Sequence, residues 1–464
     1  MFAQIDKIIT AIDNAVWGLP LICLIMATGI FLTARLGLVQ IRHLGKAFKF
    51  MFKDEEDGSG EVTSFGALCT ALSATIGTGN ITGVATAIAL GGPGALFWMV
   101  IAAFFGMATK YAEGLLAIKY RTIDEEGHVL GGPFYYIENG MGKKWTWLAK
   151  IFAFFGAGVG LFGIGTFTQV NSIASAVKNF FDPDMAHTVS LLGGNYSWAT
   201  VIAGLFLTVC VGLVVLGGIQ RIAKVSEIIV PFMAVLYVGL AVIIIITNIT
   251  DVPAALASIV KSAFTGSALA GGAVGSMFVA MQKGVARGIF SNESGLGSAP
   301  IAAAAARTKE PVRQGLVSMT GTFIDTIVIC TMTGLSIVIA GSWLNPELEG
   351  VAITMDAFQK GLPFPSFVAT FSLMLCLVFF AFTTILGWNY YGERCVEYLF
   401  NRNKGVVMGY RILYILAVFI GPYMTVKAVW NIADIFNALM AFPNLIALLA
   451  LNGVIVKETR DFHA

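Results

Sequence analysis

The sequence has few charged residues for its length. Of 464 residues, 12% are charged and 57% are hydrophobic, whereas about 25% of residues are charged in an average soluble domain. The charges are confined to short segments between apolar runs of about 18 residues or more, and a run of that length crosses roughly 30 Å of hydrocarbon as a helix. This composition excludes an ordinary soluble protein and indicates an integral membrane protein.

Signatures of several other function classes are absent. The six cysteines form no CxxC pair, and the four histidines lie in predicted loops or the tail, so no histidine metal site is expected within the membrane. Neither GxSxG nor HExxH occurs in an apolar run, and there is no GxxxxGK[ST] loop for ATP. The net charge of +2, without basic clusters interleaved with aromatic residues, does not point to nucleic acid. A membrane-embedded enzyme is therefore a distant alternative to a transporter.

The apolar runs predict an all-α protein with about eleven transmembrane helices, at roughly 15–35, 65–90, 95–119, 150–178, 198–218, 225–247, 265–287, 314–341, 366–392, 406–426 and 431–456. With the N-terminus outside, the predicted inside segments hold 24 of the 29 lysines and arginines. Those outside are Lys7, Lys178, Lys261, Lys360 and Lys427. Because Lys and Arg resist translocation, we expect a multi-pass cell-membrane protein with an external N-terminus and a cytoplasmic C-terminus.

Glycines interrupt two of the runs at matching places. One interruption is SATIGTGNITG (Ser73–Gly83), the other is GSALAGGAVGSMF (Gly266–Phe278), and four uninterrupted runs follow each. The chain therefore reads as a single transporter domain, 1–464, with an extra N-terminal helix (15–35) and two five-helix halves (65–247 and 265–456). Because five is odd, the second half is inverted relative to the first. Broken helices at matching positions of inverted halves predict a transporter's central binding site.

The first interruption has the chemistry of a binding site. Two glycines within three residues, in Gly77–Asn80, cost roughly 1 kcal/mol each in helix propensity, and unwinding frees backbone groups that lipid does not satisfy. The half-helix that begins near Gly79 would point its N–H groups at a carboxylate. The carbonyl groups of Ser73 to Ile76 would face a cation or an ammonium group. The second run offers Gly271, Gly272 and Gly275, for which close helix packing through small residues is the alternative.

Three motifs resemble those of the sodium:alanine symporter family, also called alanine or glycine:cation symporters. They are SATIGTGNITG, GGPGALFWMVIAAFFG (Gly91–Gly106) and RGIFSNESGLGSAP (Arg287–Pro300), with Val100 where the family usually has tryptophan. The resemblance covers nearly the whole chain. It implies the LeuT-like inverted-repeat fold and alternating access, with alanine or glycine imported together with Na+ and with no organic cofactor. The residues leave the choice among alanine, glycine, serine and glutamine open.

The resemblance also implies roles for individual residues. Those matching the substrate site are Thr75, Gly77, Thr78, Gly79 and Asn80 for the carboxylate, Gln169 with Phe167 beside it for the amino end, Gly275 for a backbone carbonyl contact, and Trp388 for the wall around a methyl-sized side chain. Those matching a sodium site are the hydroxyl groups of Thr383 and Thr384, with carbonyl groups near Ser73, Ile76 and Phe380. Hard cations prefer such oxygen ligands.

Each assignment has a structural alternative. Gln169 would also bond a neighbouring helix, adjacent threonines often bond back to their own helix, and Trp388 lies where an interfacial anchor is common. Asp325, in TGTFIDTIVIC, is placed well within the hydrocarbon, so it bonds a neighbouring helix, helps a cation site or accepts a proton. The last role would favour proton-coupled transport on the same scaffold.

For the other charged residues near the inner side we expect local structural roles or a place in an inner gate. Lys110 and Glu113 are three residues apart near the inner end of one run, so a local ion pair is expected. Glu293 is expected at the cytoplasmic mouth, in an inner gate or as a helix cap.

Overall fold

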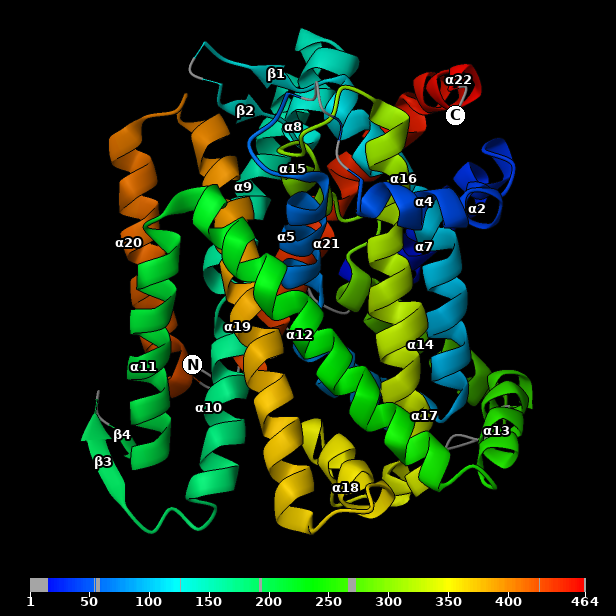
Figure 1. Cartoon of the computed structure of the whole chain (residues 1–464), viewed down its shortest axis with the longest axis vertical. Helices are drawn as coiled ribbons and strands as arrows, with labels where there is room; N and C mark the ends of the chain where they lie inside the picture. The colour runs from blue at the N-terminus through cyan, green and yellow to red at the C-terminus, as the bar shows by residue number, and fades with distance from the viewer. Residues whose placement is uncertain are drawn as a thin grey trace.

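The computed structural model describes residues 16–53, 55, 59–125, 127–191, 194–265, 273–424 and 426–462, and it is almost entirely helical (Figure 1). Two short antiparallel hairpins are the only strands of that described part: β1 (Thr122–Ile123) with β2 (Val129–Leu130), and β3 (Thr188–Leu191) with β4 (Gly194–Ser197). Everything that positions the candidate site is therefore carried by helices.

Helices fill the first half of the chain in short and long pieces. They are α2 (Leu19–Arg35), α3 (Val39–Arg42), α4 (Leu44–Met51), α5 (Ser64–Thr75), the π-helical turn η1 (Gly79–Gly83), α6 (Val84–Gly91), α7 (Gly94–Lys119), α8 (Pro133–Tyr135), η2 (Tyr136–Gly140), η3 (Lys143–Trp145), α9 (Thr146–Phe162), α10 (Phe167–Phe181), α11 (Trp198–Val215) and α12 (Gly218–Thr247). The segment α5–η1–α6 coincides with the first predicted broken helix.

The second half begins with α13, a helix between two predicted spans. It continues with the others in chain order: α13 (Val252–Thr265), α14 (Ala273–Asn292), α15 (Ala299–Ala303), α16 (Pro311–Thr322), the π-helical η4 (Phe323–Cys330), α17 (Thr331–Ala340), η5 (Ser342–Leu344), α18 (Val351–Gly361), α19 (Ser366–Leu399), α20 (Lys404–Ile420), η6 (Gly421–Tyr423), α21 (Val426–Ala450) and α22 (Asn452–Asp461).

Within the described residues, each of the eleven predicted spans corresponds to a helix or to a run of consecutive helices. By length and composition, seven helical segments of the described chain are apolar enough to cross a membrane, and an eighth qualifies if the bent pair α21–α22 is one span. The pieces of the first broken span are each too short to qualify: α5 has 12 residues, and η1 with α6 covers Gly79–Gly91. The count of about eleven crossings therefore stays a prediction.

Segments predicted to share a membrane side lie at the same end of the molecule. In Figure 1, β1, β2, α4 and α22 lie at the upper end, whereas α13, α18 and the β3–β4 hairpin lie at the lower end. The upper end also holds the connection between α15 and α16. This arrangement is the one that the lysine and arginine distribution predicts for an inside and an outside.

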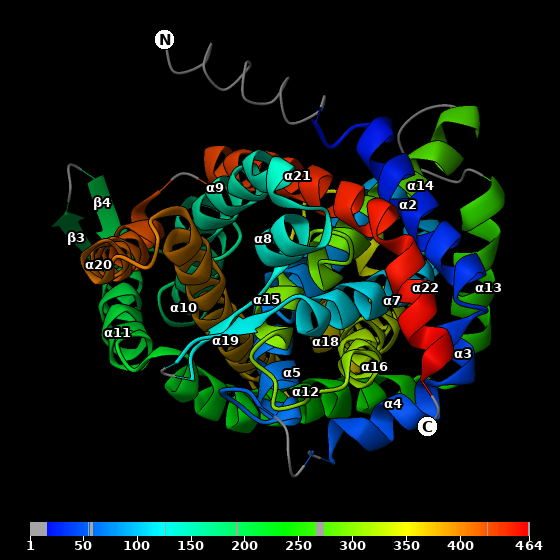
Figure 2. The same ribbon diagram turned by 90° about the horizontal axis from the view of Figure 1, so that it is seen from above.

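The helix α5 lies at the centre of the bundle, and α11 lies at its edge (Figures 1 and 2). Ten of the twelve residues of α5 are buried, and the helix packs against α12, α15, α16 and α19. By contrast, α11 buries six of its 18 residues and exposes a row of large apolar side chains: Ile202, Leu205, Phe206, Val209 and Leu213. Such an apolar surface is suited to lipid rather than to water.

Candidate functional site

The first broken helix unwinds at Ile76 and Gly77, and Thr78 is again helical (φ −60°, ψ −23°). The helix α5 ends at Thr75, Ile76 is extended (φ −76°, ψ 93°), and η1 begins at Gly79. The backbone N–H of Gly77 donates to Asn80 Oδ1 over 2.9 Å, so a side chain replaces one of the lost helical bonds. The break that the glycine pattern predicts is therefore present at the predicted place.

Neither glycine of the break has a positive φ. Their backbone conformation therefore does not require glycine, and the close approach of other helices does. A Cβ atom added to Gly77 would lie 2.5 Å from Thr384 Oγ1 on α19 and 3.2 Å from Gln169 Oε1 on α10. A Cβ atom on Gly79 would lie 3.3 Å from Ser291 Cα on α14. The break is thus enclosed by three other helices, and backbone atoms line it where side chains would not fit.

Gln169 reaches the break from α10. Its Oε1 accepts a hydrogen bond from Thr78 N over 3.2 Å, and its Nε2 donates to Ile164 O over 3.1 Å. The hydroxyl group of Thr78 is buried and has no hydrogen-bond partner in the described part of the chain. An unpaired buried hydroxyl costs free energy, so Thr78 is a polar group ready to bind a ligand.

Asn80 is fixed by Asp325, which lies in the π-helical turn η4. Asn80 Nδ2 donates to Asp325 Oδ1 over 2.7 Å, and the other carboxylate oxygen accepts from the hydroxyl groups of Ser291 (2.9 Å) and Thr326 (2.7 Å). The carbonyl oxygen of Asn80 accepts from the Thr333 hydroxyl over 2.8 Å. Of the roles expected for Asp325, bonding to a neighbouring helix is the one that these contacts establish.

Four of the predicted sodium ligands converge beside the break. Thr384 Oγ1 lies 3.3 Å from the Ile76 carbonyl oxygen and 3.0 Å from that of Phe380. Thr383 Oγ1 also donates to Phe380 O over 3.0 Å, although its other contacts are Phe379 O and Met233 Sδ. The fifth, Ser73, donates to Thr70 O within α5. Both threonines bond back to their own helix, and the Thr384 hydroxyl additionally reaches the broken one.

Trp388 lies in the protein interior rather than at an interface. Its side chain is fully buried, and its indole Nε1 donates to Glu293 Oε1 over 2.9 Å. The other carboxylate oxygen of Glu293 accepts from the Ser298 hydroxyl. An interfacial anchor is therefore ruled out for Trp388, and Glu293 is enclosed by protein instead of lying open at the mouth.

The described chain has a second break after α14, whereas the interruption predicted at Gly266–Phe278 falls mostly on residues outside the described part and stays a prediction. Residues 266–272, which include Gly271 and Gly272, fall outside the described residues, and α14 is helical from Ala273 to Asn292. The helix then stops at Glu293 (φ 57°), passes Gly295 and Gly297, and resumes as α15. The break is therefore built by the SNESGLGS segment, because buried carboxylate and amide side chains there replace the helical hydrogen bonds.

This position changes the expectation for Gly275. It lies in the first turn of α14, 16 residues before Ser291, the residue that contacts Gly79. At 1.5 Å per residue, this separation is roughly 24 Å along the helix. The structure therefore does not bring Gly275 to the first break, and Ser291 is the α14 residue that lies against Gly79.

Two further predicted residues lie away from the break. Phe167 is half-buried at the start of α10, and its ring lies beside Phe162 and close to Gly421. Thr75 donates back to the carbonyl groups of Ala71 and Leu72. It lines a small cavity on the α16 side instead.

The expected Lys110–Glu113 ion pair is not formed. Glu113 Oε1 instead accepts from Gly295 N (3.1 Å) and from Asn444 Nδ2 (2.7 Å). The carboxylate is turned towards the second break because unwinding there exposes backbone N–H groups, whose pairing outweighs a local helical ion pair.

Sequence reasoning missed Ser291, Thr326 and Thr333, which complete the polar group around Asn80 and Asp325. Only Ser291 carries a usable signal, since it precedes the polar NESG stretch inside an apolar span. The two threonines resemble the many hydroxyl residues that bond back to their own helix.

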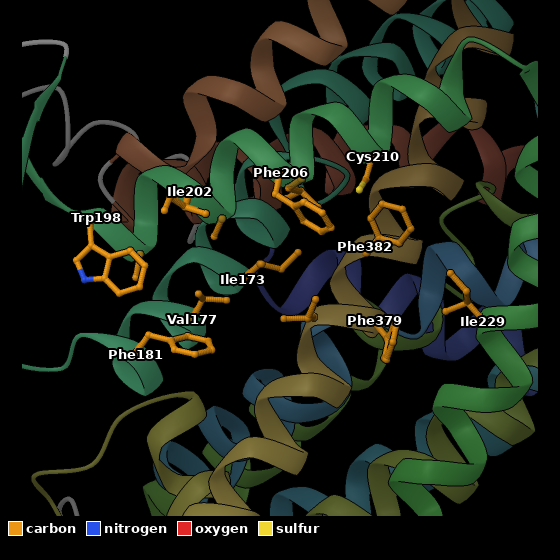
Figure 3. A pocket seen from close by; sticks show the side chains of 14 residues that line it. Ile173, Val177, Phe181, Trp198, Ile202, Phe206, Cys210, Ile229, Phe379 and Phe382 are labelled. Carbon is orange, nitrogen blue, oxygen red and sulfur yellow. The ribbon is translucent and has the colours of Figure 1, made fainter.

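An apolar groove of about 1220 Å³ lies elsewhere. It is formed between α10, α11, α12 and α19, and Ile173, Phe206 and Phe382 are among the residues that line it (Figure 3). It has no polar group to orient an amino acid, so the candidate site stays at the two breaks.

Comparison with known proteins also indicates a transporter. Residues 2–464 match the model of the sodium:alanine symporter family. The chain is 48% identical to the sodium/alanine symporter AgcS of Methanococcus maripaludis, over 98% of this chain and 97% of that one. It is 38% identical to the probable sodium/glutamine symporter GlnT of Bacillus subtilis (99% and 91%). It is 36% identical to the putative sodium/proton-dependent alanine carrier YrbD of the same organism (98% and 92%).

Proposed function

The chain belongs to the sodium:alanine symporter family and is a multi-pass membrane transporter, not an enzyme, and from this premise we propose that it imports a small neutral amino acid, alanine or glycine, together with sodium. Family membership and the relatives' names support sodium-coupled amino-acid symport. The choice of substrate, the binding sites and the coupling are argued from the residues of this chain.

The observation that carries the proposal is the position of one peptide segment, Ile76–Gly77–Thr78. Its carbonyl group at Ile76 is in contact with the Thr384 hydroxyl, and its N–H at Thr78 is in contact with Gln169. We assign the first contact to the sodium site, with Thr383, Phe380 and Ser73 as neighbours, and the second to the substrate site. Oxygen atoms of carbonyl and hydroxyl groups are the ligands that a hard cation prefers.

In the substrate site, the N-terminal end of the half-helix at Gly79 and Asn80 faces the carboxylate, because the helix dipole favours a negative charge there. The free hydroxyl of Thr78 adds a donor, and Gln169 Oε1 accepts from the substrate's ammonium group. Gly77 and Gly79 leave no space for a side chain, which restricts the substrate to a small one. Trp388, held by Glu293, closes the far wall.

Coupling follows from the shared segment. Sodium at the Ile76 carbonyl would order the unwound backbone, whose next residues bind the amino acid, so each ligand favours the conformation that the other requires. Alternating access then proceeds by movement of one five-helix half against the other about the two breaks. The opposite chain directions of α5 and α14 in Figure 1 support such inverted halves, 65–247 and 265–456, within one domain and after an extra helix.

Proton-coupled transport on the same scaffold is the second candidate. Asp325 is fully buried and bonded to Asn80, and the name of the relative YrbD includes protons as well as sodium. A carboxylate in that position would couple a proton to the broken helix in the way that sodium does.

Uptake of labelled alanine into liposomes tests the proposal. Purified protein is reconstituted and given an inward sodium gradient, an inward proton gradient, or neither. We expect uptake with the sodium gradient alone and little change when the pH gradient is dissipated. Uptake supported fully by the proton gradient would favour the second candidate, and no uptake under any condition would reject both.

The orientation has its own test. We propose an external N-terminus and a cytoplasmic C-terminus, since the segments that hold 24 of the 29 lysines and arginines would then lie inside. A reporter that is active only in the cytoplasm, fused after Ala464, should be active. Activity only from an externally active reporter would reverse the orientation.

A further inference from the structure

Lys110 is a buried cation that the proposed sites do not use. It lies in α7, nine residues before the helix ends at Lys119, and 2% of its surface is exposed. Its Nζ has no hydrogen-bond partner among the described residues. A buried ammonium group without an acceptor is strongly unfavourable, so a further group must satisfy its N–H bonds during the transport cycle.

The ammonium group faces a cavity that adjoins both breaks. The polar residues that line this cavity with Lys110 are Thr75, Asn292, Gln314 and Ser318. Thr75 is the last residue of α5 before the first break, and Asn292 is the last residue of α14 before the second. The remaining walls are apolar and come from α5, α15 and α16: Ala67, Leu68, Ala71, Leu72, Ala299, Ala303 and Gly321. The cavity is therefore next to the proposed site, on the side of the proposed cytoplasmic end.

Gln314 supplies the complementary polarity. Its side chain is 1% exposed, and its Oε1 has no hydrogen-bond partner in the described chain. Lys110 thus offers a charged donor and Gln314 an acceptor, both unpaired and both lining the same space. A zwitterionic amino acid has the matching pair, a carboxylate for the ammonium group and an ammonium group for the amide oxygen.

Three buried carboxylates influence Lys110 but do not pair with it. Glu113, Glu293 and Asp325 all interact with it electrostatically. No ion pair within 4.0 Å joins any of them to Lys110 in the described residues. Each accepts hydrogen bonds from other groups. The N–H bonds of Lys110 thus stay available to an additional acceptor.

We propose that Lys110 and Gln314 form a second, inner station for the substrate, with its carboxylate on Lys110, through which the amino acid passes when it is released to the cytoplasm. This inference rests on the proposed function. In the present conformation the cavity holds about one water molecule. Arg121 donates to the carbonyl groups of Ser59, before α5, and of Ala306, between α15 and α16, and so joins these two connections at the inner end. The station therefore fills only when this inner end opens.

The competing role for Lys110 is a hydrated counter-charge that stabilises the carboxylates. The two roles differ in what they predict for Lys110→Met. Loss of a release station slows transport and leaves the first site's equilibrium affinity intact. Loss of a counter-charge destabilises the fold, and removing one carboxylate by Glu113→Gln would then restore it.

The experiment uses the full chain, both in detergent and in liposomes. For Lys110→Met we expect alanine affinity at saturating sodium within about threefold of the original protein, and a maximal uptake rate lower by about tenfold or more. Lys110→Arg should recover part of the rate, and adding Glu113→Gln should not. Lys119→Met is the matched control on the same helix, since Lys119 is partly exposed and pairs with Glu458, and its uptake should be unchanged.

Four outcomes would overturn the proposal. They are an unchanged rate in Lys110→Met, a parallel loss of affinity, rescue by Glu113→Gln, and chloride-dependent uptake that Lys110→Met makes chloride-independent. The last would assign the ammonium group to an inorganic anion, which gluconate replacement of chloride detects. Failure of the original protein to take up alanine with sodium would instead reject the proposed function, so the two failures are distinguishable.

Discussion

Asn80 Nδ2 lies 2.7 Å from Asp325 Oδ1, and the same asparagine accepts a hydrogen bond from Gly77 N through its Oδ1. The carboxylate thus determines which way the amide faces, because only Nδ2 donates to it. An asparagine turned the other way would present a donor to the Gly77 N–H. A carboxylate 245 residues away in sequence therefore fixes the geometry of the first break.

We expect Asp325→Asn to weaken alanine binding at saturating sodium by roughly 10- to 150-fold, since a hydrogen bond to a charged group contributes about 1.5–3 kcal/mol. Isothermal titration of the purified variant measures this. Asp184→Asn, at an exposed loop residue, serves as the control and should bind normally. If Asp325→Asn binds alanine normally but loses proton-driven uptake, Asp325 would instead be the residue that carries the proton in proton-coupled transport.

Thr384→Ala should raise the sodium concentration for half-maximal uptake by about fivefold, the value of a hydroxyl ligand worth about 1 kcal/mol. Thr383→Ala should have the smaller effect, because only Thr384 reaches the Ile76 carbonyl. The double variant should need the highest sodium concentration for half-maximal uptake and should still bind alanine at saturating sodium. Sodium titrations of initial uptake rank the three, and an unchanged titration in the double variant would remove both threonines from the sodium site.

Gly79→Ala and Gly83→Ala form a matched pair within η1. Both substitutions favour the helix by roughly 1 kcal/mol, but a Cβ atom at Gly79 would press on Ser291 and Phe290, whereas one at Gly83 meets nothing within 4 Å. We expect Gly79→Ala to lose alanine affinity while remaining folded, and Gly83→Ala to bind normally with an equal or higher melting temperature. Normal affinity in a destabilised Gly79→Ala sample would mean that this glycine serves packing alone.

Trp388→Phe keeps an aromatic wall and removes the indole donor to Glu293. The buried carboxylate then loses one of its hydrogen bonds, which costs about 1–3 kcal/mol, so the melting temperature and the alanine uptake should both fall. Trp147→Phe is the control, since Trp147 is more than half exposed. If adding Glu293→Gln to Trp388→Phe restores the melting temperature, the loss came from the unpaired charge rather than from the ring.

Sequence patterns predicted those features that local physics decides. The described parts of the apolar runs are mainly helical because the hydrocarbon admits no unpaired backbone, and the Gly77–Asn80 break follows from the low helix propensity of its own residues. The convergence of Thr384 with Ile76 came from the family resemblance. It was not available from composition, since the two residues are 308 positions apart.

The second break and the Lys110–Glu113 pair show where local reasoning ends. Glycine clustering favoured 266–278, of which 266–272 lie outside the described residues, and it gave no sign of the break at Glu293, where contacts from Trp388 and Ser298 satisfy the buried carboxylate. Glu113 was expected to bond within its own helix, but the unwound backbone at Gly295 offered a better donor. In both places tertiary partners, which no window of sequence contains, determine the outcome.

The contrast between α5 and α11 bears on how such a chain diverges over evolution. Ten of the twelve α5 residues are enclosed on all sides, so almost any replacement there creates a void or a clash. Twelve of the 18 residues of α11 are not buried, and lipid accommodates one apolar side chain as readily as another. Substitutions should therefore accumulate quickly on α11 and slowly on α5, and a laboratory drift experiment under selection for alanine uptake should recover that gradient without any change in activity.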